Sequence, residues 1–263
     1  MWLRLLMLAV CFVVASNAHA GRSCEQHRPS LQTMERGMDL AARTAQALDA
    51  SGAQVVLLAR AGQDLSAYGL RYSHLGWAYR VADAPGSPWR VAHKLNHCGT
   101  ASGYLYRQGL GEFFLDDLWR YEAVWAVPAP EVQRQLLALL RDDAGTTRLQ
   151  HAPYSMVSYA WGTRYQQSNQ WALETLAAAM EPATVRTRDQ AQAWLRWKGY
   201  EPTVLRLGPL TRLGARVTAA NVAFDDHPPQ QRFADRIATV TVDSALAWLQ
   251  RAQLAGAPQR LVP

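Results

Sequence analysis

The chain has 263 residues, of which 49% are hydrophobic and 10% aromatic, so it is long and apolar enough to bury a sizeable core and is not a disordered protein. Its formal net charge of +6 comes almost entirely from arginine, because Lys94 and Lys198 are its only lysines. The arginines are dispersed and form no basic run, which argues against a nucleic-acid partner.

Residues 1–20 have the pattern of a secretory signal peptide. Arg4 supplies a positive charge, residues 5–15 form an apolar stretch too short to cross a bilayer comfortably, and Ala18-His-Ala20 has the small-x-small pattern of a cleavage site. We therefore expect a protein of the bacterial periplasm or exterior, whose mature chain begins at Gly21 and contains no transmembrane segment.

Hydrophobic spacing predicts a mixture of helices and strands. Helices are predicted over residues 30–50, 130–141, 168–180, 188–197 and 243–251, and strands over residues 54–60, 71–81, 89–97, 121–127 and 238–242. The turn at residues 84–88 predicts that the second and third strands form a hairpin. Residues 101–119 predict a packed turn or short helix, and residues 204–224 predict strands with turns at Gly208-Pro209 and Gly214.

These elements predict an α+β fold in which an antiparallel sheet packs against helices. Glu181-Pro182 is a candidate boundary. We expect a core domain over residues 21–182 and a small α/β extension over residues 183–263 that packs on it.

The two cysteines that follow the signal segment are Cys24 and Cys98. An even count in an oxidising compartment favours a disulfide between them. The alternative is that Cys98, which lies beside His97 and near His93, is a free thiol nucleophile.

Two strand histidines are candidates for acid–base chemistry. His74 shares a strand face with Gly76, which predicts open space beside its imidazole, and it is either a catalytic base or a core histidine bonded to the backbone. In the predicted hairpin His93 reaches His74, as its orienting partner or as a structural polar bridge. His93 and His97 lie roughly 13 Å apart on a strand, too far to share an ion, so no metal site is expected.

Ser168 begins the predicted helix 168–180. A serine there is typically an N-cap, but it is also a candidate nucleophile, because a helix N-terminus stabilises developing negative charge. Gln167 and Asn169 would assist with polar side chains. The cluster Asp225-Asp226-His227 either completes a site from the C-terminal part or forms a surface turn.

A histidine strand followed by a nucleophile helix resembles the circularly permuted papain-like hydrolases, the NlpC/P60 and lecithin-retinol-acyltransferase-like group. His74-Leu-Gly-Trp77 is similar to the histidine motif of that group, and Ser168-Asn-Gln-Trp171 to its nucleophile motif, with serine in place of cysteine. The resemblance covers roughly residues 50–180 and rests on short motifs. It implies a permuted papain-like fold with Ser168 as nucleophile, His74 as base and His93 as the orienting residue.

The chain also resembles a family of exported proteobacterial proteins that has no assigned activity. The shared segments include Tyr165-Gln-Gln-Ser-Asn-Gln-Trp171, Gly111-Glu-Phe-Phe114 and residues 221–227. This resemblance covers nearly the whole mature chain, but it implies no reaction.

Three hypotheses follow. The first is an exported hydrolase or acyltransferase that needs no cofactor and acts on amide or ester bonds of an envelope small molecule, peptide or lipid. The second is a catalytically inactive envelope protein that binds such a partner in the same cleft, which aromatic side chains would line: Trp77, Tyr79, Tyr159, Trp161 and Tyr165. In either case Gln167, Asn169, Trp77 and Tyr165 are the residues expected to bind the partner. The third and weakest is a thiol catalyst built on Cys98.

Overall fold

The structure is a computed structural model that describes residues 29–84 and 86–262. Its helices are α1 (Leu31–Ala50), α2 (Leu110–Phe114), α3 (Pro130–Arg141), α4 (Asp143–Thr147), α5 (Ser168–Met180), α6 (Arg188–Trp197), α7 (Pro209–Thr218), α8 (Pro229–Arg232) and α9 (Val242–Arg251), with a 3₁₀ turn η1 (Ser66–Tyr68). Its strands are β1 (Val55–Ala61), β2 (His74–Arg80), β3 (Trp89–Asn96), β4 (Gly103–Gly109), β5 (Arg120–Ala126), β6 (Thr203–Arg206), β7 (Arg236–Thr239) and β8 (Gln259–Leu261).

The centre of the molecule is a six-stranded sheet with the order β4-β3-β2-β1-β5-β8. Every neighbouring pair is antiparallel, and β2 and β3 form the predicted hairpin. All seven residues of β1 are buried, because the strand lies in the middle of the sheet and both faces are covered. The mixed α+β fold with an antiparallel sheet is thus confirmed.

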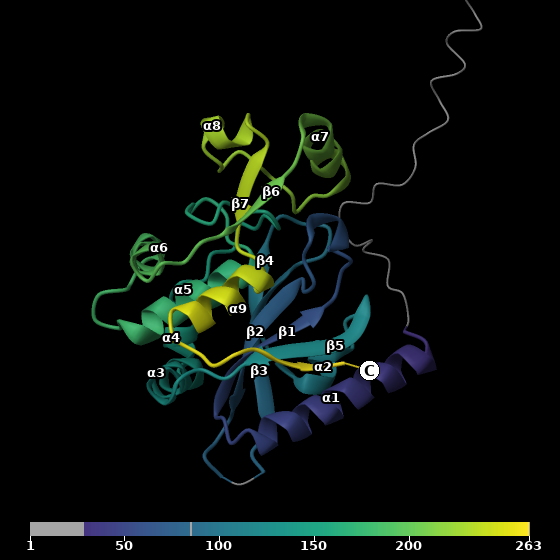
Figure 1. Cartoon of the computed structure of the whole chain (residues 1–263), viewed down its shortest axis with the longest axis vertical. Coiled ribbons are helices and arrows are strands. Elements are labelled where there is room, and N and C mark those ends of the chain that lie inside the picture. Colours follow the sequence, from purple (N-terminus) through teal and green to yellow (C-terminus); the bar gives the residue numbers. More distant parts are fainter. Residues whose placement is uncertain (1–28, 85, 263) are drawn as a thin grey trace, which may run out of the picture.

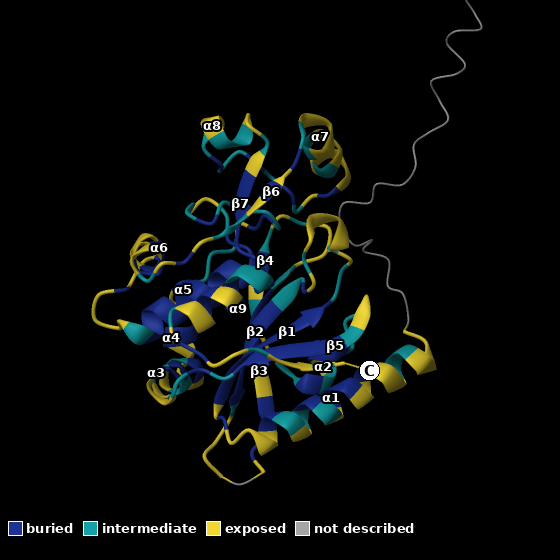
Figure 2. Cartoon of the chain, in the orientation of Figure 1, coloured by how far each residue is buried: buried dark blue, intermediate teal, exposed yellow. Residues whose placement is uncertain are grey.

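Helices cover the two faces of the sheet, as Figures 1 and 2 show. On one face α5 packs against β2 and β3, and α3, α6 and α9 complete a large apolar cluster around Trp77, Trp171 and Trp248. On the other face α1 and α2 cover a second cluster around Leu40, Phe113 and Trp125. Because side chains alternate along a strand, neighbouring residues of β2 face different clusters.

The part of the chain after residue 182 is shared between the core and a smaller lobe. Helices α6 and α9 contribute to the larger apolar cluster, and β8 pairs with β5 at the edge of the sheet. Strands β6 and β7 pair in a separate antiparallel two-stranded sheet, and the segment between them carries α7 and α8 at the end of the molecule away from α1. A third apolar cluster is formed by residues of this lobe, including Leu205, Phe224 and Ile237.

The short packed helix predicted within residues 101–119 is confirmed by α2, but two other local predictions are wrong. Residues 209–218 form a helix instead of strands, with Pro209 at its first turn and Gly214 inside it. Proline is well suited to the first turn of a helix, where its missing N–H has no intrahelical acceptor to lose. Residues 103–109 form β4, which the flanking glycines concealed. No helix in residues 29–84 and 86–262 is both long and apolar enough to cross a membrane.

The predicted signal segment and Cys24 lie outside the described residues. Export and the Cys24–Cys98 disulfide therefore stay predictions.

Candidate functional site

Ser168 is the first residue of α5, and the preceding residue caps the helix. Gln167 has extended backbone geometry, and its side-chain oxygen accepts a hydrogen bond from the N–H of Asn169, at 3.2 Å. The N-cap role that the sequence offered as the alternative for Ser168 thus belongs to Gln167. Ser168 is only 5% exposed, and its Oγ lies 3.3 Å from the hydroxyl of Tyr154. Burial raises the pKa of Tyr154, so this phenol keeps its proton at neutral pH.

The two histidines form a chain of hydrogen bonds across β2, β3 and β4. Nε2 of His74 lies 2.8 Å from Nδ1 of His93, and Nε2 of His93 lies 2.9 Å from Oε1 of Gln108. An amide oxygen only accepts hydrogen bonds, so His93 carries its proton on Nε2 and accepts from His74 at Nδ1. His74 therefore carries its own proton on Nε2, which leaves its Nδ1 as a hydrogen-bond acceptor.

Both imidazoles are held in the neutral form. Burial, followed by the positive charge of Arg60, lowers the pKa of His93 to about 3. The same two causes, in the same order, lower the pKa of His74 well below its usual range. Arg60 pairs with His74 across β1 and β2, lies over the Phe113 ring, and forms an ion pair with Asp116. Both rings therefore act as neutral hydrogen-bonding groups near pH 7.

The predicted open space beside His74 does not exist at Gly76. A Cβ atom at Gly76 would lie 2.8 Å from Cβ of His93, 2.8 Å from Cγ1 of Val91 and 2.9 Å from the carbonyl oxygen of Ala92. The glycine instead allows β3 to approach β2 closely, which brings His93 to His74. That prediction from the sequence is wrong, because the neighbouring strand fills the space.

His74 and Ser168 line the same cavity but approach it from different sides of the sheet. The His74 ring contacts Phe113, at 5.9 Å between ring centroids, on the face that α2 covers. Ser168 belongs to α5, which covers the opposite face. In the part of the chain that the structure describes, no hydrogen bond joins the two side chains, and the Ser168 hydroxyl is bonded to Tyr154 instead.

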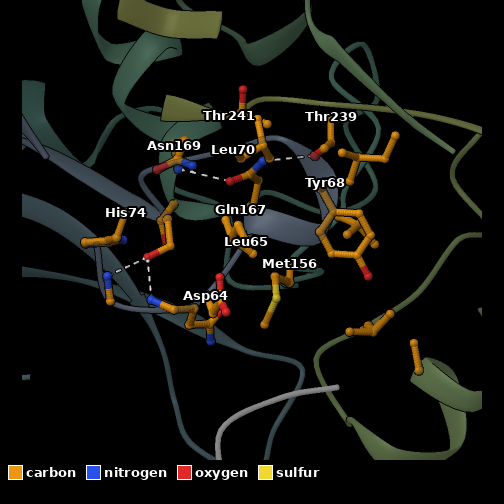
Figure 3. Close-up of a pocket in the computed structure, with 18 of the residues that line it drawn as sticks. Asp64, Leu65, Tyr68, Leu70, His74, Met156, Gln167, Asn169, Thr239 and Thr241 are labelled. Atoms are coloured by element: carbon orange, nitrogen blue, oxygen red, sulfur yellow. Dashed lines mark hydrogen bonds between the residues drawn. The ribbon is translucent and has the colours of Figure 1, made fainter. Parts of the chain in front are cut away.

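The cavity has a volume of about 830 Å³ and is polar at one end. Ser168, His74 and Tyr154 lie among Gln167, Asn169 and Thr239 at the polar end. Figure 3 shows His74 and Asn169 on one side of this space and Tyr68 across from them. Most of the remaining lining is apolar and comes from loops and from the β6–β7 lobe, including Leu70, Met156, Leu205, Leu207, Val222 and Phe224.

The four residues expected to bind substrate fall into two groups. Asn169 accepts a hydrogen bond from the Leu75 N–H, at 3.1 Å, and Gln167 donates to Thr239, at 3.0 Å; both residues line the cavity. Trp77 is fully buried in the core and donates to the carbonyl of Ala172, and Tyr165 donates to Asp225. Neither Trp77 nor Tyr165 belongs to the lining of this cavity.

A buried lysine organises the loop that carries Tyr154. Lys94 is fully buried on β3, and its ammonium group donates to the carbonyl of His151, at 2.5 Å, and to the backbone and side-chain oxygens of Gln166, at 2.8 and 2.9 Å. Burial, followed by Arg188, lowers the pKa of Lys94 to about 7. Neither Lys94 nor Tyr154 was predicted from the sequence, although a lysine inside an apolar strand was a signal for the first of them.

The cluster at residues 225–227, in the C-terminal part of the chain, bonds to the loop of residues 154–165 that carries Tyr154. Asp226 accepts from the backbone N–H of Tyr159, at 2.8 Å, and lies 3.0 Å from Nδ1 of the buried His227. Asp225 pairs with Arg164 at 3.0 Å. These contacts hold residues 154–165 against the β6–β7 lobe, beside the cavity.

Residues 47–249 match the sequence pattern of a family described as "Uncharacterized protein conserved in bacteria (DUF2145)", which is more than half of the chain. The chain belongs to this family. The region that matches DUF2145 contains His74, His93 and the β6–β7 lobe, and every residue that lines the cavity, from Gly62 to Thr241, lies within it. No curated protein and no solved structure matches the chain.

Proposed function

We propose that the protein binds, in the cavity, a ligand with an apolar body and an uncharged head that forms hydrogen bonds. The observation that carries the proposal is the distribution of groups along the cavity wall, which is polar around Ser168 and mostly apolar elsewhere, with Asp64 and Asp117 among the few other polar residues. Its volume of about 830 Å³ lies within the usual range of small-molecule sites, roughly 300–1,000 Å³. The predicted export of the chain places this ligand in the cell envelope.

The head of the ligand would meet three kinds of hydrogen-bonding group. Tyr154 and Ser168 offer hydroxyls, His74 offers the acceptor Nδ1, and the first turn of α5 offers backbone N–H groups that lack intrahelical acceptors. An ester, amide or alcohol has the donors and acceptors to satisfy such a set. The apolar body would lie against the loop and lobe side chains, where burial of its surface supplies most of the affinity.

Binding is tested with N-phenyl-naphthylamine, a neutral apolar fluorophore, titrated into the full chain. Ala215 lines the cavity, so Ala215→Phe adds a large side chain to that space and should weaken binding at least tenfold. Ala183→Phe adds the same side chain at an exposed position and should bind as the wild type does. Equal affinity in all three proteins would remove the cavity as the binding site.

A second candidate function is acyl transfer or hydrolysis at Ser168, as the resemblance to permuted papain-like enzymes implies. The observation that favours it is the His74–His93–Gln108 chain, which leaves Nδ1 of His74 to accept a proton in a cavity shared with Ser168. Ser168 Oγ would attack the acyl carbon, its proton would pass to His74, and the leaving alcohol or amine would take that proton away. This second proposal includes a permuted papain-like arrangement, in which β2, the strand that carries His74, lies beside the N-terminus of α5.

Catalysis requires the Ser168 hydroxyl to exchange its Tyr154 partner for His74, so the two proposals differ in one measurable respect. A fluorophosphonate probe should label Ser168 in the wild type, and should label it more slowly in Ala215→Phe. It should not label Ser168→Ala or His74→Gln. Labelling of the wild type that persists in Ser168→Ala would refute the assignment of the nucleophile. If the wild type binds the ligand but no protein is labelled, catalysis is refuted and only the binding function is supported.

A further inference from the structure

Helix α7 presents its large apolar side chains to the outside. Leu210, Leu213 and Val217 are 85%, 61% and 78% exposed. Their spacing of three and four residues places them on one face of the helix. No residue of α7 is buried, and Figure 2 shows the helix coloured as exposed or intermediate throughout. The side that faces the lobe carries the smaller Ala215, so the usual placement of large apolar residues against the core is reversed.

The charge on α7 and beside it is positive, while the carboxylates Asp64 and Asp117 line the cavity near Tyr68 and Trp119. Arg206, Arg212 and Arg216 lie between Glu201 and Asp225, a stretch without any acidic residue. Arg212 pairs with Asp235, whereas Arg206 and Arg216 are exposed. An apolar stripe flanked by arginines on a surface helix matches a membrane surface that carries negative charge.

The stripe is continuous with the mouth of the cavity. Leu210 lines the cavity and is also the most exposed residue of the stripe. Tyr68 and Trp119 line the same cavity and are 45% and 55% exposed. Tyrosine and tryptophan are the side chains that prefer the boundary between lipid and water. Chain segments from η1, the loop before β5 and α7 therefore bring apolar and aromatic groups together where the cavity opens.

We propose that α7, with Tyr68 and Trp119, docks the protein on an anionic phospholipid bilayer, with the mouth of the cavity facing the lipid. The stripe enters the interfacial region of the bilayer while Arg206 and Arg216 remain at the level of the headgroups. This docking surface is distinct from the polar end of the cavity and does not depend on which ligand the cavity binds. It gives an apolar ligand a path from the bilayer into the cavity that avoids water.

Vesicle co-sedimentation of the full chain tests the proposal, with vesicles of phosphatidylglycerol and phosphatidylcholine against vesicles of phosphatidylcholine alone. We expect binding to the anionic vesicles that weakens with added salt. Leu213→Asp and Val217→Asp should each reduce the binding constant by roughly tenfold or more. Arg216→Glu should weaken binding to the anionic vesicles by a similar factor and leave the neutral vesicles unaffected.

Leu31→Asp is the matched control, because Leu31 is 76% exposed on α1, at the other end of the molecule. Leu31→Asp should bind the vesicles as the wild type does. The segment before α1 has the same sequence in all variants and therefore contributes no difference between them. Because no residue of α7 is buried, the α7 variants should keep the thermal unfolding midpoint of the wild type.

Two results would overturn the proposal. One is equal vesicle binding by the wild type and both α7 variants, or no binding by any of them. The other is a wild-type dimer in sedimentation velocity that Leu213→Asp dissociates, which would assign the stripe to a second copy of the chain.

Discussion

Replacement of Gly76 by alanine tests the close approach of β2 and β3 on which the histidine pair depends. The added Cβ would lie 2.8 Å from two carbon atoms, Cβ of His93 and Cγ1 of Val91, and 2.9 Å from the backbone oxygen of Ala92. Carbon atoms at optimal separation lie about 3.5–4.0 Å apart, so β3 would have to move by at least about 0.7 Å. A rotamer change does not relieve this overlap, because neither the Ala92 oxygen nor the His93 Cβ moves with a side-chain torsion.

Overpacking of a core typically costs about 1–3 kcal/mol, and we expect Gly76→Ala to lie near the upper value. For a chain of this size that loss lowers the thermal unfolding midpoint by roughly 6–10 °C. Gly214 is the matched control, because a Cβ there meets nothing within 4 Å and the residue lies in an exposed helix. Gly214→Ala should stabilise the protein by about 0.5–1 kcal/mol.

The assay is urea unfolding of the three proteins, combined with NMR of the imidazole nitrogens. Displacement of His93 should lengthen its 2.8 Å hydrogen bond to His74 and shift both imidazole signals in Gly76→Ala. A loss of less than about 0.5 kcal/mol in Gly76→Ala, with unchanged imidazole signals, would refute the close packing of the two strands at this position.

Three further predictions concern the groups around the cavity. Because the pKa of His93 falls from 6.5 to about 3 on folding, the unfolded chain binds a proton in this range that the folded chain does not. The contribution of His93 to the free energy of unfolding should therefore be largest above pH 6.5 and fall toward pH 3, by up to about 1.4 kcal/mol per pH unit. His93→Gln should remove this part of the slope in urea unfolding at several pH values, while the lowered pKa of His74 adds a slope of the same sign. Lys94→Met leaves the carbonyl oxygens of His151 and Gln166 without this donor, while Gln166 Oε1 keeps the N–H of His151, and should destabilise by about 2–4 kcal/mol. Lys198→Met, at the other lysine, should lose less than about 1 kcal/mol; equal losses would contradict this role. Tyr154→Phe removes the hydroxyl bonded to Ser168 and should lower stability by about 1 kcal/mol in thermal unfolding, with unchanged imidazole NMR signals.

Most of the secondary structure was predictable because local rules decided it. Helices α5 and α6 have the predicted ends, Ser168–Met180 and Arg188–Trp197, since their apolar spacing agrees with residues that start and stop helices. In α7, Gly208-Pro209 suggested a turn, but proline is also favoured in the first turn of a helix. The large outward-facing side chains of α7 then gave no core-facing pattern from which to recognise it.

The candidate site was only partly predictable because two of its connections depend on tertiary packing. The hairpin of β2 and β3 with alternating side chains was sufficient to predict that His93 reaches His74. Tyr154 lies in an irregular loop whose position is fixed by Lys94 and Asp226, both remote in sequence, so no local pattern identified it as the partner of Ser168. Gly76 was misjudged because the pairing of β2 with β3 was predictable from the sequence, but how closely β3 packs over the glycine was not.

The groups around Ser168 are uncharged at neutral pH, while the two carboxylates of the cavity lining, Asp64 and Asp117, belong to the loops before η1 and β5. This arrangement argues for an uncharged ligand head beside Ser168. Burial and Arg60 keep His74 neutral, and burial keeps the Tyr154 phenol protonated. Arg60 is itself engaged in an ion pair with Asp116. A carboxylate head would lose its hydration there without gaining a counter-charge, because the charged residues that line the cavity are the acidic Asp64 and Asp117. An ester, amide or alcohol would exchange water for Tyr154, Ser168 and His74. The same chemistry describes an acyl substrate of Ser168, so the choice between binding and catalysis rests on whether Ser168 leaves Tyr154 for His74.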